Sequence, residues 1–166
     1  VGTYWFLMMI GRLCGASIGA KVSSRAMLTV VSTVGIALVL GAIFCADNIL
    51  VNMPVFKSDI SFGFAQVPVN VMLLILCGLC TSVMWGGIFN LAVEGLGKYT
   101  AAASGLFMVM VCGGGILPLI QGGVADFAGF LNSYWVIALG LAYILFYAAI
   151  GSKNVNTDIP TDDYEA

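Results

Sequence analysis

The chain has 166 residues, of which 61% are hydrophobic and only 8% are charged, with a formal net charge of −2 and no histidine. Soluble domains carry about 25% charged residues, so this composition excludes a water-soluble globular protein and favours one embedded in lipid. The lack of a basic patch argues against nucleic acid as a partner. No nucleophile–base pair or metal cluster stands out in the sequence, so we expect neither an enzyme nor a cofactor.

Five apolar segments are long enough for helices that cross the roughly 30 Å hydrocarbon core, which takes about 20 residues each. Their apolar runs are continuous rather than alternating, which predicts helices and not the strands of a barrel. The spans lie at about residues 1–20, 26–46, 67–93, 100–124 and 133–150. The expected fold is therefore an all-α membrane protein, with a helical bundle over residues 1–151 and a polar, disordered cytoplasmic tail over 152–166.

The first span contains Arg12 near its midpoint, the only full charge inside any of the five. An arginine at that depth costs roughly 3 kcal/mol, so it must face protein, water or a bound polar molecule. Trp5 lies about 20° away on the same helical face, two turns from Arg12. This pair predicts a polar cavity open to the outside. Alternatively, Trp5 anchors the helix in the interface and Arg12 pairs with a carbonyl or an acid of another helix.

Glycine recurs at every fourth position of the first span, at Gly11, Gly15 and Gly19. This spacing puts the three on one helical face and lets another helix approach closely, because packing drives helix association in lipid. We expect these glycines to serve helix packing.

The longest connector, residues 47–66, contains Pro54 and Gly63 and is followed by Pro68. Its apolar pairs predict either a segment lying in the membrane interface or an extension of the second helix.

The third span places Asn70, Cys77, Thr81, Trp85 and Ile88 within an arc of about 80°. Amide and hydroxyl groups beside a large ring suit a sugar, whose hydroxyls take hydrogen bonds while its C–H face stacks on an aromatic ring. Polar residues of this kind also form interhelical hydrogen bonds, which is the alternative interpretation.

The fourth span contains three glycines in a row, Gly113, Gly114 and Gly115, and then Pro118. Glycine weakens a helix, and Pro118 removes the bond to the carbonyl of Gly114 and forces a kink. The sequence predicts a bend here, either static or acting as a hinge.

Basic residues predict the orientation, because they concentrate on the cytoplasmic side. Lys21, Arg25, Lys98 and Lys153 would all lie on one side of the five spans, against Lys57 alone on the other. We expect the N-terminus outside and the C-terminus in the cytoplasm.

Several motifs resemble a known family. Gly11-Arg12, with Gly15 and the following Ser24-Arg25, resembles the eighth helix and next loop of sugar porters in the major facilitator superfamily. The later motifs resemble helices ten and eleven of the fucose:proton symporter family, particularly its glucose/galactose branch. They are Ile-Phe-Asn-Leu at 88–91, Gly-Leu-Gly-Lys-Tyr-Thr at 95–100, Gly-Gly-Gly-Ile-x-Pro at 113–118, and Gly122 with Ala-Asp-x-x-Gly at 125–129.

This resemblance implies the C-terminal part, helices eight to twelve, of a twelve-helix transporter in the bacterial inner membrane. It would carry a hexose or related monosaccharide by alternating access, coupled to H⁺ or Na⁺. The chain starts at Val1 with its first span, so we expect a fragment whose partner is the missing N-terminal half, including the proton-carrying carboxylates. On this hypothesis the expected sugar-binding residues are Trp5, Arg12, Asn70, Thr81 and Trp85. The alternative is a non-transporting membrane module that docks a partner protein through its glycine faces.

Overall fold

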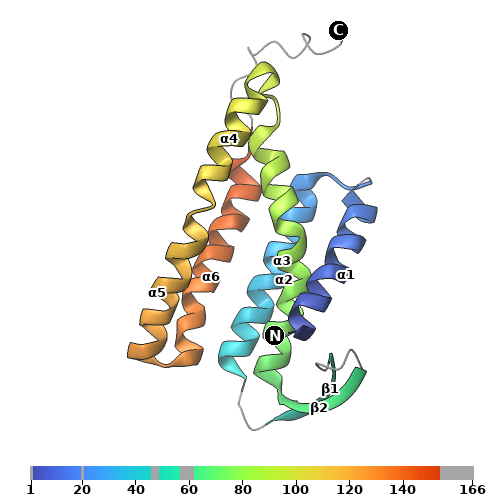
Figure 1. Ribbon diagram of the computed structural model, residues 1–166, viewed down its shortest axis with the longest axis vertical. Helices are drawn as coiled ribbons and strands as arrows, with labels where there is room; N and C mark the ends of the chain where they lie inside the picture. The colour runs from blue at the N-terminus through green and yellow to red at the C-terminus, as the bar shows by residue number, and fades with distance from the viewer. Residues whose placement is uncertain (1, 20, 46–48, 57–61, 154–166) are drawn as a thin grey trace.

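The computed structural model describes residues 2–19, 21–45, 49–56 and 62–153. Figure 1 shows long helices side by side, with a β-hairpin across one end of the bundle. In chain order the elements are α1 (Gly2–Gly19), α2 (Ser24–Phe44), β1 (Leu50–Phe56), β2 (Phe62–Pro68), α3 (Val69–Val93), α4 (Thr100–Met110), α5 (Gly113–Ala128) and α6 (Phe130–Phe146). A 3₁₀ turn, Gly97–Tyr99, precedes α4, and a π-helical turn, Tyr147–Gly151, follows α6. Most of the expected tail, residues 154–166, lies outside the described residues.

Four helical segments of the described chain are long and apolar enough to cross a membrane, and they span 21 to 32 residues each. They are Ser24–Phe44, Val69–Val93, Gly97–Ala128 and Phe130–Gly151. This confirms an all-α membrane fold, to which the β-hairpin is a local addition. The 18-residue α1, which contains Arg12, is not among the four, so its crossing of the membrane stays a prediction.

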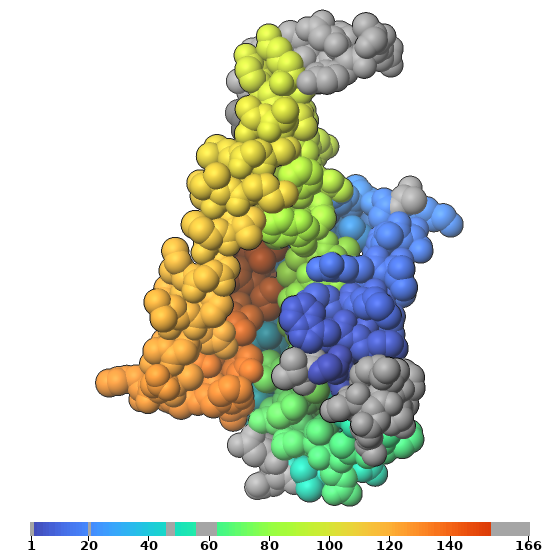
Figure 2. All heavy atoms as spheres, viewed as in Figure 1, coloured from blue at the N-terminus to red at the C-terminus, as the bar shows by residue number. Residues whose placement is uncertain are grey.

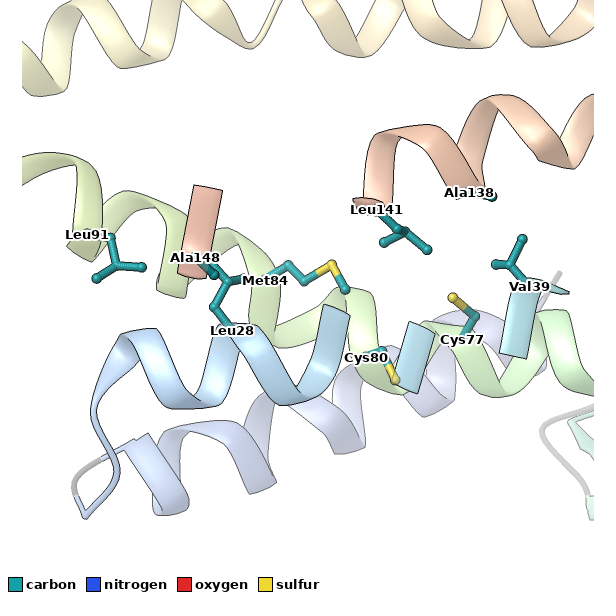
Figure 3. Packing of buried hydrophobic residues seen from close by; sticks show 9 residues of the cluster. All are labelled: Leu28, Val39, Cys77, Cys80, Met84, Leu91, Ala138, Leu141 and Ala148. Carbon is teal, nitrogen blue, oxygen red and sulfur yellow. The ribbon is translucent and has the colours of Figure 1, made fainter. Parts of the chain in front are cut away.

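The core of the bundle lies around α3, which packs against α1 and α2, while α2 packs in turn against α6. Met84 of α3 and Leu141 of α6 meet at Gly35 of α2, where an added Cβ would lie 3.6 and 3.5 Å from them. The buried apolar cluster at these contacts is shown in Figure 3: Leu28, Val39, Cys77, Cys80, Met84, Leu91, Ala138, Leu141 and Ala148.

The contact between α1 and α3 depends on glycine. Gly11 and Gly15 are both buried, and a Cβ at Gly11 would overlap the hydroxyl of Ser82. A Cβ at Gly15 would lie 2.8 Å from Cγ2 of Val83, closer than real side chains come. At Gly19 the nearest atom, Cε of Met27, would be 3.8 Å away, which is ordinary contact. Only the first two glycines therefore need to be glycine for this packing.

The span expected at 100–124 consists of two helices. The chain breaks at Val111 and Cys112, upstream of the three glycines at which the bend was expected. The amide of Val111 bonds to the carbonyl of Met108 and that of Cys112 to Val109, so the helix tightens to i→i+3 bonds there. The amides of Gly114 and Gly115 make the same kind of bond, to the carbonyls of Val111 and Cys112, so the tightened stretch extends into the glycines, while Pro118 lies inside α5. Whether the bend is static or acts as a hinge stays a prediction. The break lets α4 contact α3 while α5 packs against α6.

The connector after α2 is an antiparallel hairpin, with Val51 opposite Val67 and Met53 opposite Ala65. The expectation that it extends the second helix is wrong, since α2 ends at Phe44. Proline at Pro54 is incompatible with a helix interior but is tolerated on a strand edge. Met53 is buried, and the hairpin rests on the ends of α1 and α3.

A one-residue turn joins α5 and α6. Gly129 has φ +95°, a conformation that glycine adopts without strain, and its amide bonds to the carbonyl of Ala125. The two helices therefore extend to Ala128 and start at Phe130, beyond the predicted limits of 124 and 133. These added turns bring α5 and α6 together as an antiparallel pair.

The connection from α1 into the first turn of α2, the turn before α4 and the end of the π-helical turn lie toward the end of the bundle opposite the hairpin (Figure 1). These segments carry Lys21, Arg25, Lys98 and Lys153. Arg25, at the start of α2, donates from Nη2 to the carbonyl of Ser152 over 3.0 Å, which links the first turn of α2 to the end of the last helix. Lys57 lies outside the described residues. The clustering of basic residues agrees with the expected topology, while the orientation itself stays a prediction.

Candidate functional site

A cleft opens between α3 on one side and α5 and α6 on the other, and Figure 2 shows it between α1 and α5. It consists of two adjoining hollows of about 490 and 230 Å³, which share Thr81, Gln121 and Ile137. Val39 of α2 contributes to the larger hollow, and most of the lining is apolar. The larger hollow falls in the size range of small-molecule sites, which are mainly apolar with a few placed polar groups.

On one wall of the cleft, two hydroxyl groups meet. Thr81 is the middle residue of α3, and its Oγ1 lies 3.2 Å from the phenolic oxygen of Tyr4 on α1. The Thr81 hydroxyl also donates to the carbonyl of Gly78 over 3.2 Å, as is usual for threonine in a helix. Tyr4 reaches this place because Gly78 has no side chain: a Cβ there would lie 2.9 Å from the tyrosine ring.

The opposite wall holds an amide and a second phenol. Gln121 of α5 lines both hollows, and Tyr134 of α6 lines the larger one. Both side chains are half-buried. Within the described part of the chain, neither side chain makes a hydrogen bond. Polar groups in such surroundings are usually paired. Since these two side chains have no partner among the described residues, their polar atoms could bond to a ligand.

Sequence reasoning found Thr81 but missed Tyr4, Gln121 and Tyr134. Gln121 carries the signal that led to Asn70, an amide inside an apolar span. Tyr4 and Tyr134 each precede a tryptophan near the end of a span, a pattern that is typical of the membrane interface rather than of a cleft. Their role in the cleft depends on how the helices are turned, which no single span reveals.

Trp5 and Arg12 do not line the cleft. The Trp5 ring is 60% exposed and meets the Tyr4 ring edge-on, with centroids 6.0 Å apart. The exposed Arg12 guanidinium lies 3.9 Å from Sδ of Met8. Arg12 lines a separate hollow of about 320 Å³ together with Gly15, Gly19 and Asn90. The predicted cavity containing both residues is therefore not formed by the described chain.

Asn70 is buried in the first turn of α3, near the hairpin, and its Oδ1 accepts from the amide of Val71 over 2.8 Å. It lines neither of the two hollows. This placement suits a structural contact at the end of α3.

Trp85 packs in an aromatic cluster rather than on the cleft lining. Its ring, 47% exposed, lies 5.3 Å from that of Phe107 on α4, and Phe107 lies 5.5 Å from Phe89. These rings form the contact through which α4 meets α3. Among the five predicted sugar-binding residues, Thr81 alone is placed in the cleft.

Of the residues at which a bend was expected, Pro118 alone lines the cleft. Pro118 lines the smaller hollow. At Gly113, Gly114 and Gly115 an added Cβ would meet no atom within 4 Å. In the described part of the chain no three His, Cys, Asp or Glu side chains gather as metal ligands.

Several curated proteins are similar to this chain. A glucose/galactose transporter of Brucella abortus is 44% identical over 77 residues, which is 46% of this chain and 19% of that protein. A Helicobacter pylori protein provisionally named a glucose/galactose transporter is 31% identical over 155 residues, which is 90% of this chain and 33% of that protein. The L-fucose-proton symporter of Escherichia coli is 33% identical over 92 residues, covering 55% of this chain and 21% of that protein.

No family model matches the chain, and no solved structure matches it. The chain spans at most about a third of the length of these curated relatives, all of which are transporters rather than enzymes. The chain belongs to the family of major facilitator sugar transporters that includes the glucose/galactose transporters and the L-fucose-proton symporter.

Proposed function

We propose that the chain forms part of the sugar pathway of a secondary transporter, which carries a hexose or related monosaccharide across the membrane by alternating access. The observation that carries this proposal is the cleft in lipid-embedded helices, with hydroxyl groups on one wall and an amide on the other. Family membership supports the same substrate class, since the relatives are named for glucose, galactose and fucose.

The position of the cleft suits a transporter. Thr81 lies at the middle of α3, so a sugar held there would lie near the middle of the bilayer. Transporters of this type bind substrate at mid-membrane between two halves that rock around it. The apolar remainder of the lining would then contact the rest of the transporter or the C–H face of the sugar.

The arrangement in the membrane is part of the proposal. We assign α1, α2, α3, the α4–α5 pair and α6 to helices eight to twelve of a twelve-helix transporter in the inner membrane, with the start of α1 outside. The E. coli relative is named a proton symporter, which favours H⁺ over Na⁺ as the coupling ion. The groups that carry the proton would lie outside this chain.

Arg12 has a different role in this proposal from a direct sugar contact. A guanidinium facing lipid costs roughly 3 kcal/mol or more, and Arg12 is exposed on α1. We therefore expect the rest of the transporter to supply a polar or acidic partner to the hollow that Arg12 lines.

The test is uptake by the full-length protein in sealed vesicles. Labelled D-glucose and D-galactose should accumulate when an inward proton gradient is applied, and collapse of the gradient should release them. The same vesicles with a sodium gradient alone should show facilitated entry without accumulation. Failure to move any hexose or deoxyhexose under all three conditions would contradict the proposed function.

A further inference from the structure

We infer that Gln121 binds the sugar directly from the α5–α6 side of the cleft, opposite Tyr4. The sugar hydroxyl at Tyr4 has to donate a hydrogen bond, whereas the hydroxyl at Gln121 can either donate or accept one. The inference rests on the proposed function, and it assigns to Gln121 a role in specificity.

The position of Gln121 is the first reason. It is one of the residues common to both hollows, on the wall that faces Thr81 across the cleft. Its amide is half-buried and makes no hydrogen bond to the described residues. An amide in apolar surroundings without a partner is costly, which favours a bound group that pairs with it.

The two contacts of the Thr81 hydroxyl suggest which proton each one uses. Either oxygen could donate in the contact of 3.2 Å between Thr81 and Tyr4, but Thr81 has one proton. We infer that this proton is donated to the carbonyl of Gly78, in which case Tyr4 donates to Thr81. A hydroxyl has one donor and two acceptor positions, so the oxygen of Tyr4 has only acceptor capacity left for a ligand. A sugar hydroxyl that meets Tyr4 therefore has to donate.

Gln121 behaves differently, because its amide has both a carbonyl acceptor and an NH₂ donor. It can pair with a hydroxyl in either sense, and it can donate to a group that has no proton. The cleft should therefore tolerate a fluorine in place of the sugar hydroxyl at Gln121 and reject one in place of the hydroxyl at Tyr4.

The experiment measures competition by monodeoxy and monodeoxyfluoro hexoses against labelled hexose uptake, with the full-length protein in vesicles. The variants are Gln121→Met, which keeps the length of the side chain, and Tyr4→Phe. In the unaltered protein, the hydroxyl that meets Gln121 is identified by two analogues. The hexose that lacks this hydroxyl should compete about tenfold less well, and the hexose with fluorine in its place should compete nearly normally. In Gln121→Met, this deoxy hexose should compete as well as the parent hexose, while deoxygenation at the other positions should still weaken competition. The comparison has the form of a double-mutant cycle.

A second position should lose about tenfold on both deoxygenation and fluorination, and Tyr4→Phe should abolish that loss alone. Asn132→Met is the matched control, because Asn132 is an exposed amide at the start of α6 that donates to the carbonyl of Ala128, outside the cleft. If Gln121→Met does not insert, Gln121→Asn supplies the shortened amide and should raise the half-saturating hexose concentration several-fold.

Unchanged analogue profiles in inserted Gln121 variants, with normal hexose uptake, would overturn the role of Gln121 and leave the proposed function standing. Absence of hexose uptake by the unaltered protein would overturn both.

Discussion

α1 and the α4–α5 pair pack differently around α3. α1 lies against α3 through Gly11 and Gly15, both buried, and the hairpin rests on the ends of both helices. In the described structure, neither α4 nor α5 has a buried residue. α4 meets α3 at the ring of Phe107, and beyond the break α5 leaves α3 for α6. α1 is therefore packed directly on α3, whereas the α5–α6 wall is joined to α3 through α4 at one end and through the packing of α6 on α2.

The comparison shows that glycine has two uses in this chain. At Gly11, atoms of α3 occupy the space that a side chain would need, so substitution would push α1 and α3 apart. At Gly114 nothing lies within 4 Å, and the effect of glycine is on the helix itself. We infer that α1 and α3 move as one unit and that α4 and α5 change their angle during transport.

The largest expected effect comes from filling the contact between α1 and α3. Gly11→Val would place methyl groups against Ser82 and the carbonyl of Leu79, which lies 3.0 Å from a Cβ at this position. We expect a loss of about 3 kcal/mol, at the upper end of overpacking costs. Thermal unfolding of the purified protein in detergent, followed by tryptophan fluorescence, measures this.

Gly114→Val is the matched control for that substitution and should shift the melting temperature much less. Equal destabilisation by the two variants would show that the structure has assigned the two glycine faces wrongly.

A smaller loss should follow removal of the ring that joins α4 to α3. Phe107→Ala deletes two aromatic contacts, with Trp85 and Phe89, each worth about 1 kcal/mol. Unfolding measurements should show a loss of about 2 kcal/mol from these contacts. Phe127→Ala is the control, because the ring of Phe127 is 96% exposed.

The same pair of rings tests the predicted sugar contact of Trp85. If Trp85 touches the sugar, Trp85→Ala will raise the half-saturating hexose concentration and Phe107→Ala will not. If Trp85 acts only by bracing α4, the two variants will change uptake alike.

The smallest effect is expected from stiffening the start of α5. Replacing Gly113, Gly114 and Gly115 together by alanine favours helix by up to about 1 kcal/mol per residue. We expect maximal uptake to fall about fivefold with little change in half-saturation, because a hinge that bends less readily slows the conformational step. Gly105→Ala in α4, which also has no neighbour within 4 Å, is the control. Full uptake rates in the triple variant would show that the break is static.

Much of the fold could be predicted from the sequence, because continuous apolar runs and the length of a bilayer-spanning helix leave few alternatives. The hairpin was missed because strands of seven residues inside an apolar chain resemble helix extensions. The break lies directly before the glycines at which the sequence places a bend, and its i→i+3 bonds extend to Gly114 and Gly115. The sequence does not show that α4 contacts α3 through Phe107 while α5 packs on α6.

The site was only partly predictable. Thr81 was found because its hydroxyl stands out on an apolar helix. Gln121 gives a similar signal, but its importance appears only when α5 is seen turned toward α3. Arg12, the strongest signal in the sequence, lines another hollow. The energetic cost of a charge in the membrane predicts that Arg12 has a polar partner, but it does not predict where that partner lies.

The central claim, that the cleft takes the sugar, is tested most directly by protection of a cysteine placed in it. Ile137 lines both hollows and has no proposed hydrogen bond to the ligand, so Ile137→Cys reports occupancy without removing a contact. With the native cysteines other than Cys14 replaced by serine, saturating hexose should slow maleimide labelling at position 137 by several-fold and leave exposed Cys14 unaffected. Labelling at position 137 that is indifferent to hexose, in vesicles that still take hexose up, would contradict the account.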